Sequence, residues 1–120
     1  MKVAVTSQGP ELTSQVDPRF GRAAYFIVAD TEAEGFTAVA NEQNVNAMQG
    51  AGVQSAQVVV DQGVAAVLTG HCGPKAFRAL SAAGVHVYVG ANGSVSDALE
   101  QLKAGALEEA PEADVEGHWT

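Results

Sequence analysis

The sequence predicts a single α/β domain with a five-stranded mixed sheet and helices on both faces of that sheet. Strand-like and helix-like segments follow one another in the order βββαβαβα, and the two crossover units at the end require parallel strands covered by helices. The unbroken apolar run Val64–Leu68 is typical of a strand that is buried on both faces. The length of 120 residues gives room for one hydrophobic core.

The first half of the chain contributes a strand and a hairpin. Apolar, β-favouring runs predict strands at residues 2–6, 24–29 and 36–40. A short acidic turn at 30–35 joins the last two of these strands into a hairpin. The first two strands are separated by a polar stretch at 7–20, which is interrupted by Pro10 and Pro18. Loops of this length inside compact domains are often functional.

The second half alternates helices with buried strands. Helical periodicity predicts a helix between Gly52 and Gly63, a helix at 74–83, and a helix that begins at Ser94 and stops before Gly105. The first of these helices is expected to place four residues on its inner face: Val53, Ala56, Val59 and Val60. Ser94 with Asp97 forms the pattern of a capping box. The intervening apolar runs predict strands at 64–69 and 85–89.

These elements define the expected topology and the domain limits. The strands at 2–6, 64–69 and 85–89 should be parallel, with the strand at 24–29 antiparallel at one side. From Ala106 onward the chain is rich in Glu and Ala, includes Pro and Asp, and contains no Lys or Arg. We therefore expect an α/β domain over residues 1–105 and an acidic, disordered tail over residues 106–120.

Composition and charge exclude several classes of function. The net charge of −8 argues against nucleic acid or an anionic membrane as a partner. The sequence has no apolar run of membrane-spanning length and no signal-peptide pattern, so we expect a cytoplasmic protein. The single cysteine excludes an internal disulfide and a multi-cysteine metal site. Four of the six Lys and Arg residues fall in two short windows, 19–22 and 75–78, which favours a site for a small anion.

The loop after the predicted strand at 64–69 contains the residues best suited to binding or catalysis. It contains His71, Cys72 and Lys75, and Pro74 opens the following helix. A loop at the carboxyl end of a parallel strand is where open α/β folds bind their ligands, and the N–H groups at a helix start attract anions. Cys72 has two interpretations, an inert buried hydrophobe or a thiol whose thiolate is stabilised by its neighbours.

Two other polar segments are candidates for the same site. Arg19 and Arg22 flank Phe20 and Gly21 at the end of the long loop, a placement suited to pairing with an anion. The segment 41–49 is rich in Asn and Gln. It is either a polar turn or a source of amide donors.

Four segments together resemble the dinitrogenase iron–molybdenum cofactor biosynthesis family: MKVAV at the N-terminus, RFGRAAYF at 19–26, GAG at 50–52 and TGHCGPKAF at 69–77. The resemblance covers residues 1–105. It implies a ribonuclease-H-like fold and a non-enzymatic carrier of metal–sulfur clusters or their precursors. The lone cysteine and the acidic charge resemble the branch that binds a molybdenum–copper sulfide cluster non-covalently; other molybdenum–iron–sulfur clusters are compatible. Family context also implies ATPases of the MinD/Mrp kind as partners.

The resemblance also implies what the site must supply. The sulfides of such a cluster already saturate its metals, so the protein provides N–H donors, cations and apolar contact. The residues expected to do so are Arg19, Phe20, Gly21, Arg22, Met48, Gly50, Ala51, Gly52, His71, Cys72, Gly73 and Lys75. No direct metal ligand is expected; Cys72, Met48 and His71 have the side chains that would suit that role best.

A second interpretation makes the protein an enzyme. His71 and Cys72, followed by five residues and Arg78, match the His-Cys-x5-Arg signature of cysteine phosphatases. The alternative is thus a cysteine-dependent phosphatase or sulfur-transfer enzyme that uses Cys72 and Arg78. Pro74 removes one N–H donor from such a loop, and Ala79 stands where these enzymes usually have Ser or Thr. No trio of carboxylates is placed to hold Mg²⁺ for nuclease chemistry.

Overall fold

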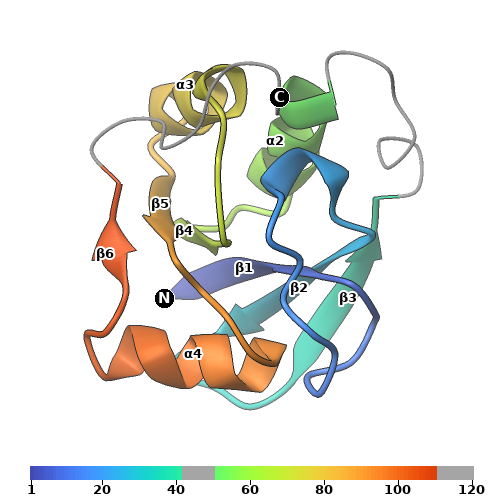
Figure 1. Cartoon of the computed structure of the whole chain (residues 1–120), viewed down its shortest axis with the longest axis vertical. Helices are drawn as coiled ribbons and strands as arrows, with labels where there is room; N and C mark the ends of the chain where they lie inside the picture. Colours follow the sequence, from blue (N-terminus) through green and yellow to red (C-terminus); the bar gives the residue numbers. More distant parts are fainter. Residues whose placement is uncertain (42–50, 111–120) are drawn as a thin grey trace.

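The protein folds around one mixed sheet (Figure 1). The computed structural model describes residues 1–41 and 51–110. The described strands are β1 (Lys2–Ser7), β2 (Tyr25–Asp30), β3 (Phe36–Ala40), β4 (Ala66–Leu68), β5 (His86–Val89) and β6 (Glu108–Glu109). The helices are the 3₁₀ turn η1 (Phe20–Arg22), α2 (Ala51–Asp61), α3 (Pro74–Ala82) and α4 (Val95–Lys103).

The strand order is β3-β2-β1-β4-β5-β6. β1 pairs in parallel with β4, and β4 pairs in parallel with β5. β2 is antiparallel to β1 and forms a hairpin with β3. These pairings confirm the predicted fold class and the predicted direction of each strand. Because β1 and β4 run in parallel, the loops that follow them leave the same edge of the sheet.

The sheet contains six described strands, one more than the five that we predicted. Glu108 and Glu109 pair antiparallel with Val89 and Tyr88, and the N–H of Ala110 donates to the carbonyl oxygen of Val87 at 2.8 Å. The strand was missed because two glutamates carry no apolar alternation. Residues 106–110 therefore belong to the ordered domain and not to the tail, whose remaining residues, 111–120, lie outside the described part of the chain.

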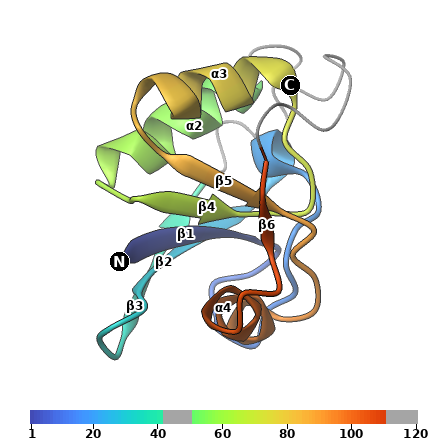
Figure 2. The ribbon, with the colours of Figure 1, turned by 90° about the vertical axis from the view of Figure 1, so that its left-hand side faces the viewer.

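Helices cover both faces of the sheet, as predicted (Figure 2). α2 and α3 lie on one face, over a core that includes Phe26, Val59 and Leu80. α4 lies on the other face, over a second core built around Ile27 and Leu68. Each core residue named here is completely shielded from solvent. The two cores hold the strands rigidly between the helices and so fix the positions of the loops at the sheet edge.

Local sequence explains where the helices begin and end. Pro74 occupies the first turn of α3, as predicted. The capping box at the start of α4 is confirmed, because the Ser94 hydroxyl accepts from the Asp97 N–H and the Asp97 carboxylate accepts from the Ser94 N–H, each at 3.0 Å. Among the described helices, none is long and apolar enough to cross a membrane.

The inner face of α2 differs from the prediction. Val53 is 44% exposed, whereas Ser55 and Val59 are completely buried. The buried positions Gly52, Ser55, Ala56 and Val59 follow helical spacing, and Val53 lies about 100° away from that stripe. Hydrophobicity alone predicts Val53 on the buried face, but Ser55 is buried there instead. Its burial is possible because its hydroxyl donates a hydrogen bond to the carbonyl oxygen of Gly21.

Candidate functional site

Two loops come together at the edge where β1 and β4 end. The backbone of Arg19 forms an isolated parallel bridge with that of His71. The His71 N–H donates to the carbonyl oxygen of Pro18 at 2.8 Å, and the Phe20 N–H donates to the carbonyl oxygen of His71 at 3.2 Å. The loop after β1 and the loop after β4 are therefore joined by backbone hydrogen bonds. This places the segment 17–22 beside the segment 69–75, as their shared position at the sheet edge predicts.

The close approach of the two loops depends on Gly70. A Cβ atom at this position would lie 2.8 Å from both the Cα and the carbonyl oxygen of Pro18. Distances below 3.0 Å are essentially never seen for real Cβ atoms, and both neighbouring atoms belong to the backbone. Glycine therefore allows the two backbones to lie against each other.

A buried polar cluster lies beneath the paired loops. The Thr6 hydroxyl lies 2.7 Å from the carbonyl oxygen of Asp17 and 3.0 Å from the Thr69 hydroxyl. The Asp17 N–H in turn donates to the carbonyl oxygen of Thr6 at 2.9 Å. Both threonine side chains are completely buried. This cluster ties the last residues of β1 and β4 to the start of the Arg19 loop.

Asp17 orients the backbone at Arg19. One oxygen of its carboxylate accepts a hydrogen bond from the Arg19 N–H at 3.0 Å, which is the geometry of an Asx turn. Asp17 is only 7% exposed, and burial raises the pKa of its carboxyl above the ordinary value. The hydrogen bond from Arg19 and the positive charge of Arg19 act in the opposite direction and lower that pKa.

A second buried network fixes the 3₁₀ turn against α2. The side-chain amide of Asn41 donates to the carbonyl oxygen of Ala23 at 2.9 Å and to the Ser55 hydroxyl at 3.0 Å. The Ser55 hydroxyl donates to the carbonyl oxygen of Gly21 at 3.2 Å. Asn41 and Ser55 are buried, so these bonds are shielded from water. The network positions η1, and with it Arg22, against the first half of α2. Asn41 thus has a structural role.

The predicted site residues divide into an exposed set and a buried set. The side chains of Arg19, His71 and Lys75 are exposed and that of Arg22 is partly exposed. The buried positions are Phe20, Gly21, Gly52, Cys72 and Gly73. Ala51 is the first residue of α2, and Met48 and Gly50 lie outside the described residues. The structure therefore brings the backbone of Arg19 beside that of His71, four residues before Lys75.

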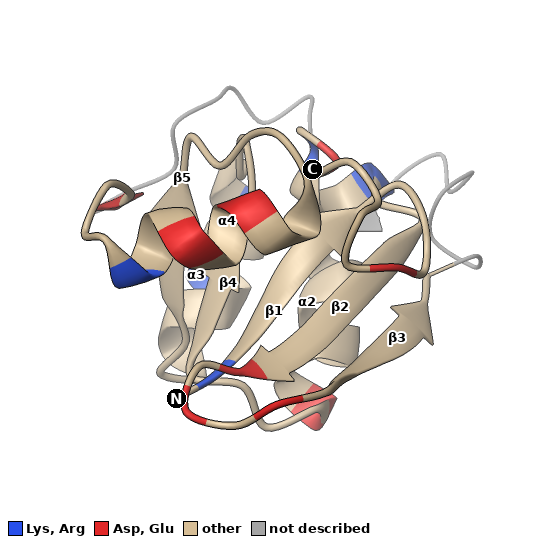
Figure 3. Ribbon diagram, turned by 90° about the horizontal axis from the view of Figure 1, so that it is seen from below, with Lys and Arg blue, Asp and Glu red and all other residues tan. Residues whose placement is uncertain are grey.

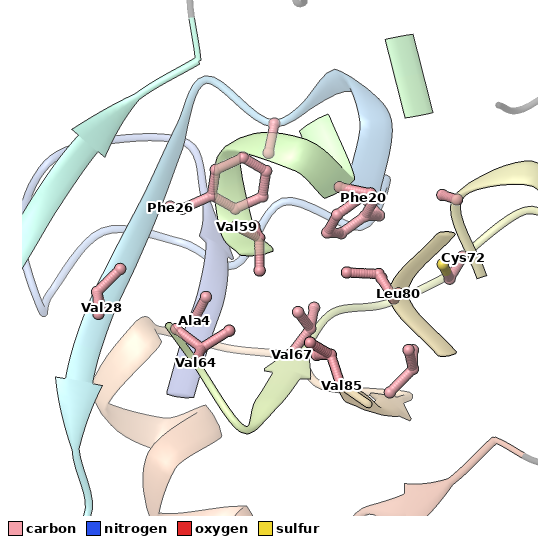
Figure 4. Close-up of a cluster of buried hydrophobic side chains, with 14 residues drawn as sticks. Ala4, Phe20, Phe26, Val28, Val59, Val64, Val67, Cys72, Leu80 and Val85 are labelled. Atoms are coloured by element: carbon pink, nitrogen blue, oxygen red, sulfur yellow. The ribbon is translucent and has the colours of Figure 1, made fainter. Parts of the chain in front are cut away.

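Cys72 points into the core and away from the surface (Figure 4). It is 1% exposed and packs in the same cluster as Phe20 and Leu80. Its Sγ atom lies 3.8 Å from the carbonyl oxygen of Gly73. Arg78, the arginine of the phosphatase signature, is exposed on α3. A phosphatase nucleophile must reach its substrate, and this thiol is covered.

The start of α3 adds N–H donors to the exposed cations. Gly73 is the N-cap of α3, and no side chain caps the helix in the described structure. The first turn of a helix presents N–H groups and the positive end of the helix dipole. Lys75 lies in that turn. Asp and Glu residues lie on α4 and in the β2–β3 turn, away from these loops (Figure 3).

Sequence reasoning missed the residues that hold the site together. Sequence alone does not single out Thr6, Asp17, Ser55 or Thr69, because an isolated polar residue at a strand end, in a loop or in a helix has no distinctive pattern. Each is buried, and each bonds to a residue distant in the chain. For Thr6 and Thr69, a polar residue at the end of an apolar strand run is the local signal; Asp17 and Ser55 have none.

Comparison with known proteins identifies the family. Residues 1–105 match the family described as dinitrogenase iron-molybdenum cofactor. The chain belongs to this family. The apo form of the orange protein from Desulfovibrio gigas superposes with a TM-score of 0.92 and 39% identity, over 95% of this chain and 96% of that one. Family membership and this likeness support a metal-cluster-binding role for the dinitrogenase iron-molybdenum cofactor domain described here.

Two further relatives extend the comparison. TM1290 from Thermotoga has a TM-score of 0.79 and 39% identity, over 90% of this chain and 91% of that chain. MJ0580 from Methanocaldococcus jannaschii is 28% identical over 110 residues, which is 90% of each chain. The family match over residues 1–105 confirms the family suggested by the four sequence segments.

Proposed function

We propose that the protein is a non-enzymatic carrier of a metal–sulfur cluster, a molybdenum–copper sulfide or a related molybdenum cofactor precursor. One observation carries the proposal. The backbone pairing of Arg19 with His71 brings the exposed Arg19 beside the loop that leads to Lys75 and the start of α3, while the single thiol of the chain is buried. Such a surface suits an anion whose metals already carry their own sulfide ligands.

The donor set fits a preformed cluster better than a bare metal ion. Among the described residues, no three His, Cys, Asp or Glu side chains lie close enough together to hold a metal. Arg19 and Arg22 in the first of the paired loops and Lys75 just after the second supply positive charge in a chain of net charge −8. The cluster is the cargo in this proposal, and the protein binds it through charge, N–H donors and packing.

The strength of binding can be estimated from the charged contacts. A hydrogen bond to a charged group contributes about 1.5–3 kcal/mol. Loss of both Arg19 and Arg22 should therefore weaken binding by roughly two to four orders of magnitude. Replacement of the buried Cys72 by Ala should change binding much less, because its thiol does not face the cargo. Added salt should weaken binding, since the cations are exposed.

Reconstitution tests the proposal. The apo protein is incubated with tetrathiomolybdate and copper, passed through gel filtration, and examined by visible absorption and metal analysis. The variants are Arg19→Ala/Arg22→Ala and Cys72→Ala, with Lys2→Ala/Lys103→Ala as a control that removes the same charge elsewhere. We expect only the double arginine variant to lose the cluster. If the wild type retains no metal, or if Cys72→Ala alone loses it, the proposed mode of binding is wrong.

The phosphatase alternative lacks a supporting observation. Hydrolysis of phosphate esters through Cys72 needs the thiol beside the bound phosphate, and the thiol is packed against Leu80 instead. Transfer of the cluster to or from a MinD/Mrp-type ATPase is part of the proposal by family context alone. Co-purification of the loaded protein with such an ATPase, compared with the apo protein, tests that step. The expected cytoplasmic location stays a prediction.

A further inference from the structure

The outer edge of β3 is open in the described part of the chain. β3 is the first strand in the sheet order and pairs only with β2 there (Figure 1). Four of its five residues are exposed, including Phe36 at 38%. Its sequence, FTAVA, contains no charged residue and no proline. Natural edge strands usually carry such residues, which prevent pairing with another chain.

The register with β2 shows which backbone groups point outward. The pairing joins Phe26 with Val39 and Ile27 with Ala38, and the Asn41 N–H donates to the carbonyl oxygen of Ala24 at 2.8 Å. Hydrogen-bonded and non-hydrogen-bonded pairs alternate along an antiparallel ladder. Val39 and Thr37 therefore bond toward β2. The N–H and carbonyl groups of the remaining residues of the strand point away from it: Phe36, Ala38 and Ala40.

We propose that β3 pairs with β3 of a second copy of this chain, antiparallel about a twofold axis at Ala38, to give a continuous sheet across the dimer. In this register Phe36 lies opposite Ala40 of the second copy, and Ala38 lies opposite its own equivalent. The three outward residues of each copy then exchange backbone hydrogen bonds. The strand is self-complementary in this arrangement.

The facing side chains support a second copy as the occupant. On one face of the sheet, the large Phe36 meets the small Ala40 at both ends of the interface, and the two Ala38 methyl groups meet at its centre. On the other face, Thr37 lies opposite Val39. No pair places two large side chains or two charges opposite each other, and aromatic or β-branched pairs of this kind stabilise sheets.

The charges near β3 also favour the antiparallel arrangement. The turn before β3 carries Glu32 and Glu34, whereas β3 itself is uncharged (Figure 3). A twofold axis at Ala38 places the two acidic turns at opposite ends of the interface. Each copy has a net charge of −8, so the two chains still repel at long range. Salt should therefore strengthen self-association, whereas it would weaken binding of a basic partner strand.

The interface rests on five residues from each copy, so the dimer should be weak. We expect a dissociation constant of roughly 0.1–1 mM, at the weak end of specific interfaces. Sedimentation equilibrium over a protein concentration range of about 0.02–2 mM, at low and high salt, measures it. Ala38→Lys places two ammonium groups opposite each other at the axis and should weaken association at least about tenfold. Ala33→Lys, in the exposed turn, has the same charge change and should leave dimerisation unimpaired.

A crosslinking experiment tests the register. Opposed Cα atoms of a hydrogen-bonded antiparallel pair lie about 5.5 Å apart, within the span of a disulfide. Mild oxidation of Ala38→Cys should give a covalent dimer, whereas Ala33→Cys should associate as the wild type does but form no covalent dimer. The buried Cys72 is retained in both variants. A wild-type protein that stays monomeric throughout the concentration range would overturn the proposal. Dimerisation that Ala38→Lys leaves unchanged, or that salt weakens, would also overturn it.

Discussion

Replacement of Gly70 by alanine tests whether the two loops of the candidate site depend on close backbone contact. The added Cβ would lie 2.8 Å from two backbone atoms of Pro18, so the loops must separate by several tenths of an ångström. Overpacking of this kind costs about 1–3 kcal/mol. Separation also weakens the hydrogen bonds between His71 and Pro18 and between Phe20 and His71, each of which contributes about 0.5–1.5 kcal/mol. We expect Gly70→Ala to lower the free energy of unfolding by about 2–4 kcal/mol.

The measurement is urea denaturation followed by circular dichroism, with cluster retention measured in parallel. The matched control is Gly35→Ala, where φ is +95° and no atom lies within 4 Å of the new Cβ. That variant reports the cost of a left-handed residue, about 1 kcal/mol, and should bind the cluster normally. An alanine without close neighbours and without a positive φ is usually neutral or stabilising. If Gly70→Ala is as stable as the wild type, the close approach of the loops has no energetic role.

Three further substitutions test single features. Burial raises the pKa of Asp17, so the folded state favours its protonated form. The contribution of Asp17 to stability therefore falls as the pH rises above the ordinary pKa of an aspartate. Asp17→Asn should remove this dependence, and parallel curves of stability against pH for variant and wild type from pH 3 to 7 would contradict it. Ser55→Ala leaves the buried carbonyl of Gly21 without its hydrogen bond and should lower the free energy of unfolding, measured by chemical denaturation, by about 1–3 kcal/mol. Replacement of the exposed Ser96 by alanine should change it little. Ser94→Ala removes the capping box of α4 and should lower stability by about 0.5–2 kcal/mol; an unchanged thermal midpoint would show that the cap is dispensable.

The periodicity of apolar residues, together with the glycines that end helices, predicted most of the fold. The alternation of buried strands with helices located β1, β4, β5, α3 and α4, because each of these has an apolar pattern longer than its surroundings. β6 has only two residues and no such pattern, so only its pairing with β5 reveals it. Val53 was assigned to the core because hydrophobicity alone cannot show that the hydroxyl of Ser55 has a buried partner.

The candidate site was predicted less completely than the fold. The carboxyl end of β4 and the arginine pair could be found from sequence, since parallel strands and clustered charge have general consequences. Cys72 could not be placed, because a cysteine at a helix start is compatible with both a buried and an exposed thiol. The supporting contacts of Thr6 and Asp17 join residues that are distant in the chain, and a single sequence carries no record of such pairs.

Because of the bridge between Arg19 and His71, the site can form only after both halves of the sheet have folded. The first residue belongs to the loop after β1, and the second belongs to the loop after β4, so neither half of the chain can form the bridge alone. During synthesis, the loops that carry Arg19 and His71 can pair only after β4 and the following turn have left the ribosome and docked on β1. A truncated or half-folded chain would therefore present its arginines without the geometry that retains cargo. In the proposed carrier role, only molecules whose sheet is already built would retain cargo.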